Sequence, residues 1–226
     1  MLDNKNRPPM SPKQKQIFFG YLMGDGYLNK TGTLTVEQGK DQLKFAEWMH
    51  EKLKPFCTKN NEVKPVFFKK EPSFLKSKKA GQIRSYRFNT QAWFKDEHSM
   101  WYLNQGLEGT TEKAKFIKRL PSNIAEFFTP LFIIVWFACD GTKPADCKGA
   151  KFEVTAFTAK ERELLKTLFL QKYQIHANIN RQGTSSKGTE QWALCILAED
   201  YSKFYSLITQ DPLIQDLFPY KLCQKP

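Results

Sequence analysis

The chain has 226 residues, with 35 Lys and Arg against 23 Asp and Glu, which gives a net charge of +12 and a pI near 9.4. Its 41% hydrophobic content excludes a disordered chain, and five scattered cysteines without a Cys-x-x-Cys pair exclude a disulfide scaffold or a zinc knuckle. The longest apolar stretch, residues 131–139, falls far short of the roughly 20 residues of a membrane span, and the N-terminus has no apolar signal segment. We therefore expect a non-secreted protein with an anionic partner.

The N-terminal part of the sequence predicts alternating helices and strands. Residues 11–28 begin with Ser-Pro, which caps and opens a helix, and continue with apolar residues to Asp-Gly. A later segment has a helical period, because Leu43, Ala46, Met49 and Leu53 share one face. The predicted elements are a helix at 11–28, a strand at 33–38, a helix at 41–53, strands at 65–68 and 85–90, and a helix at 98–105.

The same order of elements returns in the second part of the sequence. It starts at a Thr-Pro that opens a second apolar helix ending in Asp-Gly. The predicted elements are a helix at 129–143, a strand at 151–158, a helix at 159–173, strands at 176–180 and 192–198, and a helix at 201–210. A basic chain built from two similar halves can bind along a nucleic-acid duplex, with each half contacting one part of it. We therefore expect one domain at residues 1–120 and a second at 121–226.

The two apolar helices are predicted to pack against each other. Gly20 and Gly24 lie four residues apart, which gives the first helix a face of small residues, and either Gly20 or Gly24 is expected to accommodate Val135 opposite. The glycine of each Asp-Gly pair is expected to close its helix in the left-handed conformation. Side-by-side packing then brings Asp25 and Asp140 together at the C-terminal ends of the helices.

Two carboxylates at two helix C-termini form a strongly negative cluster, since each terminus carries about half a negative charge. Hard divalent cations with oxygen ligands suit such a cluster, and a combination of carboxylate and phosphate ligands is typical of magnesium. Metal ions placed between the aspartates and a phosphodiester stabilise both the attacking and the leaving oxygen. The pattern therefore predicts the centre of a nuclease, although a single Asp-Gly pair after a helix is also ordinary turn chemistry.

Positive charge is concentrated in the first half. Residues 1–120 carry 23 Lys and Arg against 12 Asp and Glu, a net charge of +11, whereas the rest of the chain carries only +1. Residues 52–95 alone hold 12 basic and 2 acidic side chains, interleaved with aromatic residues. This segment is predicted to form a basic hairpin that contacts nucleic acid.

These features resemble the LAGLIDADG homing endonucleases in their single-chain form with two motifs. The sequences FFGYLMGDG at residues 18–26 and IIVWFACDG at residues 133–141 stand where the family has its nine-residue motif. The stretch KRLPSNIAEFFTPLF before the second motif and the C-terminal PYKL are also similar. The resemblance implies an α+β fold of two pseudo-symmetric αββαββα halves, with the motif helices at the centre and curved antiparallel DNA-binding sheets.

The resemblance also implies roles for individual residues. The metal-binding acidic residues correspond to Asp25 and Asp140, with the backbone carbonyls of Gly24 and Cys139 as further ligands. The catalytic lysines correspond to Lys118 and Lys221, which stabilise phosphate charge or polarise water. Gln38 is a weaker catalytic candidate for ordering solvent, with Thr155 as its counterpart in the second half. Mg²⁺ is the expected cofactor; Mn²⁺ is expected to substitute, and Ca²⁺ to support binding without cleavage.

In this family the strands supply base contacts in the major groove and hairpin loops hold phosphates. The expected DNA-binding residues are Lys69, Lys70, Lys76, Lys78, Lys79, Arg84, Arg87, Arg181 and Lys187.

The function implied is that of a site-specific homing endonuclease that hydrolyses both strands of a long asymmetric double-stranded DNA target and thereby moves an intron. Two alternatives remain: an RNA maturase that assists splicing of its own intron, and a DNA-binding regulator without chemistry. The resemblance further implies a monomer with no membrane partner, located in an organelle (mitochondrion or chloroplast) or in a prokaryotic cytoplasm.

Overall fold

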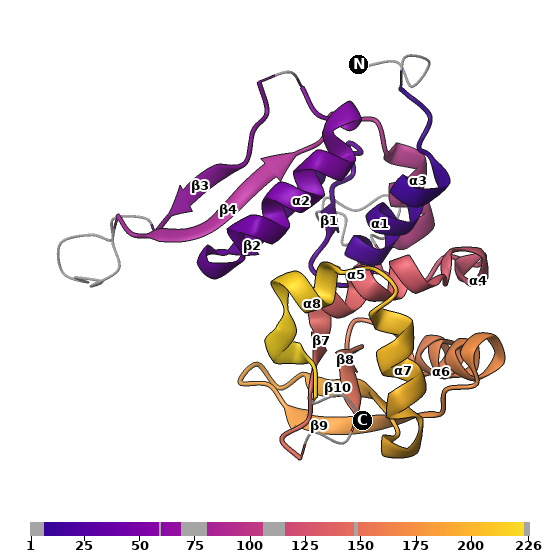
Figure 1. Cartoon of the computed structure of the whole chain (residues 1–226). Helices are drawn as coiled ribbons and strands as arrows, with labels where there is room; N and C mark the ends of the chain where they lie inside the picture. The colour runs from indigo at the N-terminus through magenta and orange to yellow at the C-terminus, as the bar shows by residue number, and fades with distance from the viewer. Residues whose placement is uncertain (1–6, 59, 69–80, 106–115, 147–148, 224–226) are drawn as a thin grey trace.

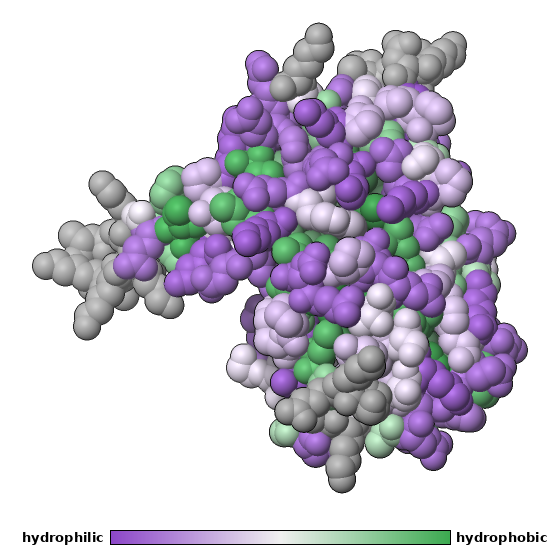
Figure 2. Space-filling view, viewed as in Figure 1, coloured by the Kyte–Doolittle hydropathy of each residue, from purple (hydrophilic) through white to green (hydrophobic). Residues whose placement is uncertain are grey.

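The computed structural model describes residues 7–58, 60–68, 81–105, 116–146 and 149–223. Figure 1 shows a four-stranded sheet in each half, with helices α1 and α5 between them at the centre of the molecule. Hydrophilic residues predominate on the face in view, and apolar ones are scattered over it (Figure 2).

The N-terminal half contains one sheet with the strand order β1-β2-β4-β3, in which every neighbouring pair is antiparallel. A separate antiparallel pair, β5–β6, follows it. The elements are α1 (Pro12–Met23), β1 (Tyr27–Leu28), β2 (Leu34–Gly39), α2 (Leu43–Leu53), β3 (Lys64–Phe67), β4 (Ile83–Asn89), α3 (Lys95–Trp101), β5 (Tyr102–Asn104) and β6 (Phe116–Lys118).

The C-terminal half repeats this arrangement with the strand order β7-β8-β10-β9, again antiparallel throughout. Its elements are α4 (Ile124–Phe127), α5 (Pro130–Asp140), β7 (Gly141–Thr142), β8 (Ala150–Glu153), α6 (Ala159–Tyr173), β9 (Ala177–Thr184), β10 (Glu190–Ile196), α7 (Tyr201–Ile208) and α8 (Leu213–Leu217). The order αββαββα therefore occurs twice, and the predicted fold class is confirmed.

The predicted starts of both motif helices are confirmed. Ser11 caps α1: its hydroxyl accepts a hydrogen bond from the backbone N–H of Gln14, whose side chain bonds back to the Ser11 N–H. Thr129 caps α5 by accepting from the N–H of Phe132. Each helix has proline in its first turn, where a missing N–H costs nothing.

The expectation that the motif glycines are left-handed was wrong. Gly141 has φ −72° and ψ 144°, which is extended backbone, and Gly26 is not among the glycines with positive φ. What requires glycine is space: a Cβ on Gly141 would lie 2.4 Å from the carbonyl oxygen of Phe137, and one on Gly26 would lie 2.7 Å from that of Tyr21. The chain turns directly back over the last turn of each helix.

The predicted close packing of α1 against α5 is confirmed. A Cβ on Gly20 would lie 2.5 Å from the carbonyl oxygen of Phe132 and 3.1 Å from the Cβ of Val135. A Cβ on Gly24 would lie 2.5 Å from the Cβ of Cys139. The two glycines thus let the helix backbones approach each other: Gly20 makes room for Val135, and Gly24 makes room for Cys139.

The segment at 98–105 differs from its prediction as a helix. Helix α3 ends at Trp101, and β5 begins at Tyr102, whose backbone is extended with φ −133° and ψ 128°. The reason is tertiary: the Tyr102 hydroxyl accepts a hydrogen bond from the N–H of Leu28, and its strand pairs with β6.

Buried side chains from both halves form one continuous core that includes the apolar residues of α1 and α5. We propose a domain division between residues 120 and 121, in the connection from β6 to α4. Among the described residues, no helix is both long and apolar enough to cross a bilayer.

Candidate catalytic site and nucleic-acid interface

The two aspartates of the motifs come together where α1 and α5 end. Asp25 is exposed and directly follows Gly24, the C-terminal cap of α1. Asp140 is half-buried and is the last residue of α5. Because a Cβ on Gly24 would lie 3.1 Å from Oδ2 of Asp140, that carboxylate rests against the backbone next to Asp25.

Nearby lysines compensate the negative charge of the two carboxylates only in part. Burial and then the charge of Asp25 raise the pKa of Asp140 to about 7, against the opposing effect of Lys118. Within the described part of the chain, neither carboxylate forms an ion pair with a lysine, arginine or histidine. Two carboxylates held together without such a pair form a donor set that favours a divalent cation.

Lys118 and Lys221, the two candidate catalytic lysines, lie at the C-terminal ends of α1 and α5. Lys118 on β6 donates from Nζ to the carbonyl oxygen of Gly24 at 3.1 Å. Lys221 lies in a 3₁₀ turn near the C-terminus and donates to the carbonyl oxygens of Phe137, Ala138 and Cys139 at 3.2, 2.7 and 3.1 Å. Both ammonium groups therefore stabilise the negative end of a helix.

Burial lowers the pKa of Lys118 and of Lys221, although Asp25 and Asp140 act in the opposite direction on both. Lys221 has three N–H donors, and its three contacts with α5 use all of them. In this geometry it caps α5 and fixes the carbonyl of Cys139.

The thiol of Cys139 lies in the same buried, negatively charged surroundings. Burial, together with the charges of Asp25 and Asp140, raises the pKa of this thiol well above its ordinary value.

Gln38 lies beside Asp25, and the part of the chain that the structure describes places no equivalent amide beside Asp140. Its Nε2 donates to Oδ2 of Asp25 at 3.0 Å. Tyr27, two residues after Asp25, pairs with Thr35, and Thr142, two residues after Asp140, pairs with Lys151.

Gln38 lies three residues after Thr35, and Val154 lies three residues after Lys151. The position equivalent to that of Gln38 is therefore occupied by Val154, which is buried and apolar. The expected counterpart, Thr155, lies one residue further along the chain. The hydroxyl of Thr155 instead accepts from the N–H of Trp192 at 2.7 Å.

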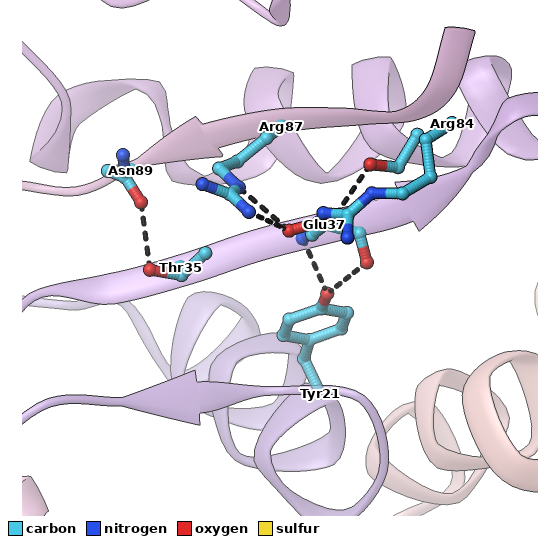
Figure 3. A network of polar contacts seen from close by, with 7 residues as sticks. Tyr21, Thr35, Glu37, Arg84, Arg87 and Asn89 are labelled. Atoms are coloured by element: carbon cyan, nitrogen blue, oxygen red, sulfur yellow. Dashed lines mark hydrogen bonds and ion pairs between the residues drawn. The ribbon is translucent and has the colours of Figure 1, made fainter. Parts of the chain in front are cut away.

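Sequence reasoning missed the role of Tyr21, because a tyrosine in an apolar helix looks like a core residue. Its ring is fully buried, yet its hydroxyl contacts Gln38 Nε2 at 3.2 Å and the N–H and carbonyl of Glu37 at 3.2 and 3.3 Å. Figure 3 shows the ring pointing from the helix to the backbone of β2. Burial raises the pKa of Tyr21 well above 10, so the hydroxyl stays protonated.

Arg84 and Arg87, two of the predicted DNA-binding residues, both contact the carboxylate of Glu37 (Figure 3). Arg84 NH2 lies 2.6 Å from Oε1, and Arg87 Nε lies 2.8 Å from Oε2. The Ser85 hydroxyl donates to Oε1 at 2.5 Å. Partial burial raises the pKa of Glu37, but Ser85 and the arginines outweigh it, so that the pKa is lowered. Both arginines remain about half exposed, at 46% and 40%.

The remaining predicted DNA contacts are dispersed. Lys187 is exposed in the turn between β9 and β10, and Arg181 is exposed on β9, where it pairs with Glu190 at 3.0 Å. Strand alternation places Arg181 opposite the face that carries Asn178 and Asn180, two polar residues that sequence reasoning did not single out. Five further lysines lie outside the described residues: Lys69, Lys70, Lys76, Lys78 and Lys79.

Comparisons with curated proteins find two proteins named as mRNA maturases. The chain is 27% identical over 229 residues to the cytochrome b mRNA maturase bI2 of Saccharomyces cerevisiae, covering 97% of this chain and 49% of that protein. It is 23% identical to the maturase of the same name from Debaryomyces hansenii, covering 95% of this chain and 75% of the relative. The chain thus spans about half the length of the first of these relatives.

Comparisons with solved structures find homing endonucleases. The homing endonuclease I-WcaI bound to its DNA recognition sequence superimposes with a TM-score of 0.64 at 17% identity, covering 98% of this chain and 88% of that one. A variant of I-DmoI in complex with nicked target DNA and Mn gives a TM-score of 0.50 at 12% identity, covering 89% and 98%. Residues 15–204 match the sequence model of the LAGLIDADG DNA endonuclease family. With this match over most of its length, the chain belongs to the LAGLIDADG DNA endonuclease family.

Proposed function

We propose that the protein is a metal-dependent homing endonuclease that hydrolyses both strands of a long, asymmetric double-stranded DNA target. The observation that carries the proposal is the meeting of Asp25 and Asp140 at the ends of α1 and α5, without an ion pair among the described residues. An arrangement with one carboxylate from each half suits two phosphodiesters, one on each strand.

The residues at this site fit a divalent metal ion. Asp25 and Asp140 would hold it with their carboxylates, and the carbonyls of Gly24 and Cys139 are further hard oxygen donors. The raised pKa of Asp140 supports the fit, since it marks a buried carboxylate beside a second negative charge, an environment that a bound cation would stabilise. A bound Mg²⁺ ion, or Mn²⁺ in its place, would polarise the phosphate and lower the pKa of a water nucleophile.

The chain's own groups then have separate tasks. Lys118 and Lys221 hold the carbonyls of Gly24 and Cys139 in place, and their positive charge offsets charge that develops on the phosphate. Gln38 holds the carboxylate of Asp25 through its amide.

For DNA recognition we propose the open faces of the two sheets, with Arg84 and Arg87 as described contacts, the lysines of residues 69–79 as phosphate contacts, and Arg181 and Lys187 in the second half. The DNA-bound structure of I-WcaI, which shares this fold, supports this placement. If about 8 phosphates are neutralised, log affinity falls against log salt concentration with a slope of roughly −7. The excess charge of the first half should make it the tighter-binding half.

We further propose a monomer, since the chain carries both motifs, and an intron-encoded origin. An organelle is the proposed compartment, because both curated relatives are named for cytochrome b mRNA.

The test is cleavage of a plasmid library of candidate sites with Mg²⁺ or Ca²⁺, followed by sequencing of the released ends. Double-strand cuts at one long motif with Mg²⁺ but not with Ca²⁺ are expected. Asp140→Asn should abolish them and still fold, because the change is isosteric and removes a charge that burial and Asp25 disfavour. Asp41→Asn, at an exposed acid, is the matched control and should cut like the wild type. Tight binding without cutting in any divalent metal would refute the proposal.

The second candidate is a maturase that binds its own intron RNA. Similarity to two cytochrome b mRNA maturases over at least 95% of this chain favours it. Intron RNA splicing assays separate the two: a maturase keeps its splicing activity in Asp140→Asn, whereas the endonuclease loses DNA cutting in the same variant. A DNA-binding regulator would bind DNA equally well in both forms and show neither activity.

A further inference from the structure

The Tyr21 hydroxyl is the centre of a hydrogen-bond group between α1 and β2. The side chain is 0% exposed, so its hydroxyl has no water to replace a lost partner. It donates to the carbonyl of Glu37 and accepts from the N–H of Glu37 and from Nε2 of Gln38. Figure 3 shows the two bonds to Glu37. One donor and two acceptor positions are all that a hydroxyl offers, so this group is fully used.

The second contact of the Gln38 amide is the carboxylate of Asp25. Nε2 carries two N–H groups, and its two contacts are the Tyr21 hydroxyl at 3.2 Å and Asp25 Oδ2 at 3.0 Å. A rotated amide would point Oε1 at the carboxylate, where two acceptors repel. Gln38 is itself only 3% exposed, and the Tyr21 hydroxyl gives Nε2 a second acceptor inside the protein, so it fixes the amide in the position from which it donates to Asp25.

The described residues of the C-terminal half contain no equivalent hydrogen-bond group beside Asp140. The offset between Asp25 and Asp140 places Trp136 at the position of Tyr21, and strand pairing places Val154 at that of Gln38. Among the described residues, the buried Nε1 of Trp136 has no hydrogen-bond partner. The positions that correspond to Tyr21 and Gln38 are therefore held by a tryptophan and a valine, and neither side chain offers the hydroxyl or the amide found beside Asp25.

We propose that Tyr21 is a positioning residue which holds Gln38 against Asp25, so that only one of the two strand cuts depends on this hydrogen-bond group. The proposal rests on the endonuclease function above. The consequence is that the two strand cuts can be separated: loss of the hydrogen bonds that join Tyr21, Gln38 and Asp25 should turn an enzyme that cuts both strands into one that preferentially nicks one defined strand.

The test is Tyr21→Phe, which removes only the hydroxyl. Supercoiled plasmid carrying the target is digested with Mg²⁺, and each strand's cut is followed on end-labelled DNA. We expect one strand to be cut at least about tenfold more slowly, a loss of about 1.4 kcal/mol of transition-state stabilisation, while the other strand is cut at the wild-type rate. Gln38→Leu should give the same strand bias, and the double variant should be no slower than Gln38→Leu alone, because Tyr21 acts through Gln38.

Tyr173→Phe is the matched control. It also removes a tyrosine hydroxyl that donates to a backbone carbonyl, that of Phe128 at 2.9 Å, but it lies in α6, away from the aspartates. It should lower the melting temperature and leave both strand cuts unchanged, so the effect of lost stability is separated from that of lost positioning.

A second readout needs neither metal nor DNA. In ¹H–¹⁵N spectra, the side-chain amide of Gln38, assigned by its loss in Gln38→Leu, should be well dispersed in the wild type and collapse to the position of a free amide in Tyr21→Phe. An unchanged amide signal, or equal slowing of both strands, would overturn the inference. Failure of the wild type to cut any DNA would instead overturn the proposed function, and the strand bias with it.

Discussion

The contact between α1 and α5 can be tested with one added methyl group, in Gly20→Ala. The new Cβ would lie 2.5 Å from the carbonyl oxygen of Phe132, which belongs to the backbone and cannot rotate away. An ordinary contact needs roughly another 0.8 Å, so the helices must separate; overpacking of this kind costs about 1–3 kcal/mol. The higher helix propensity of alanine returns about 0.5–1 kcal/mol. We expect a net loss of about 1–2 kcal/mol in the free energy of unfolding.

The assay is thermal and urea unfolding, and for a chain of this size the loss corresponds to a fall in melting temperature of about 2–8 °C. The control is Gly39→Ala, where a Cβ would meet nothing within 4 Å. Adding Val135→Ala should not rescue Gly20→Ala, because the closest atom is the Phe132 carbonyl and not the valine side chain. A Gly20→Ala protein as stable as the wild type would refute the reasoning about helix packing.

Three further outcomes are expected. Glu37→Gln should reduce discrimination between cognate and altered DNA sites in competition binding, because the carboxylate that orients two arginines is lost; equal discrimination would contradict this. Thr158→Ala should lower the unfolding free energy by about 1 kcal/mol in urea titrations, since it removes both bonds of the capping box of α6; Thr209→Ala, outside any such box, is the comparison. Asp200 has a lowered pKa, caused first by Lys203 and then by the His176 N–H, so its stabilisation is present above the unfolded pKa of about 4 and is lost as pH falls through the lower folded value. The stability difference between wild type and Asp200→Asn should therefore shrink below about pH 4, and a constant difference would contradict it.

Local sequence determined the parts of the fold that depend on neighbouring residues. Ser11 and Thr129 with their following prolines start the motif helices whatever packs around them, because the cap bonds form within one turn. The repeated order of helices and strands likewise predicted that Asp25 and Asp140 come together, and the family resemblance pointed to Lys118 and Lys221, which contact backbone carbonyls at the ends of α1 and α5.

Only the tertiary structure decided what lies next to these residues. The motif glycines proved to be required by the approach of backbone atoms, not by left-handed φ, and Tyr102 became a strand residue because β6 pairs with it. In the sequence, Tyr21 has the pattern of a core residue. In the structure, β2 places the backbone of Glu37 and the amide of Gln38 within hydrogen-bond distance of its hydroxyl. The register of β8 likewise placed Val154, and not Thr155, at the position equivalent to that of Gln38. Such contacts join residues distant in the chain, and a shift of one residue in strand register reverses the face of every side chain, so local patterns cannot specify them.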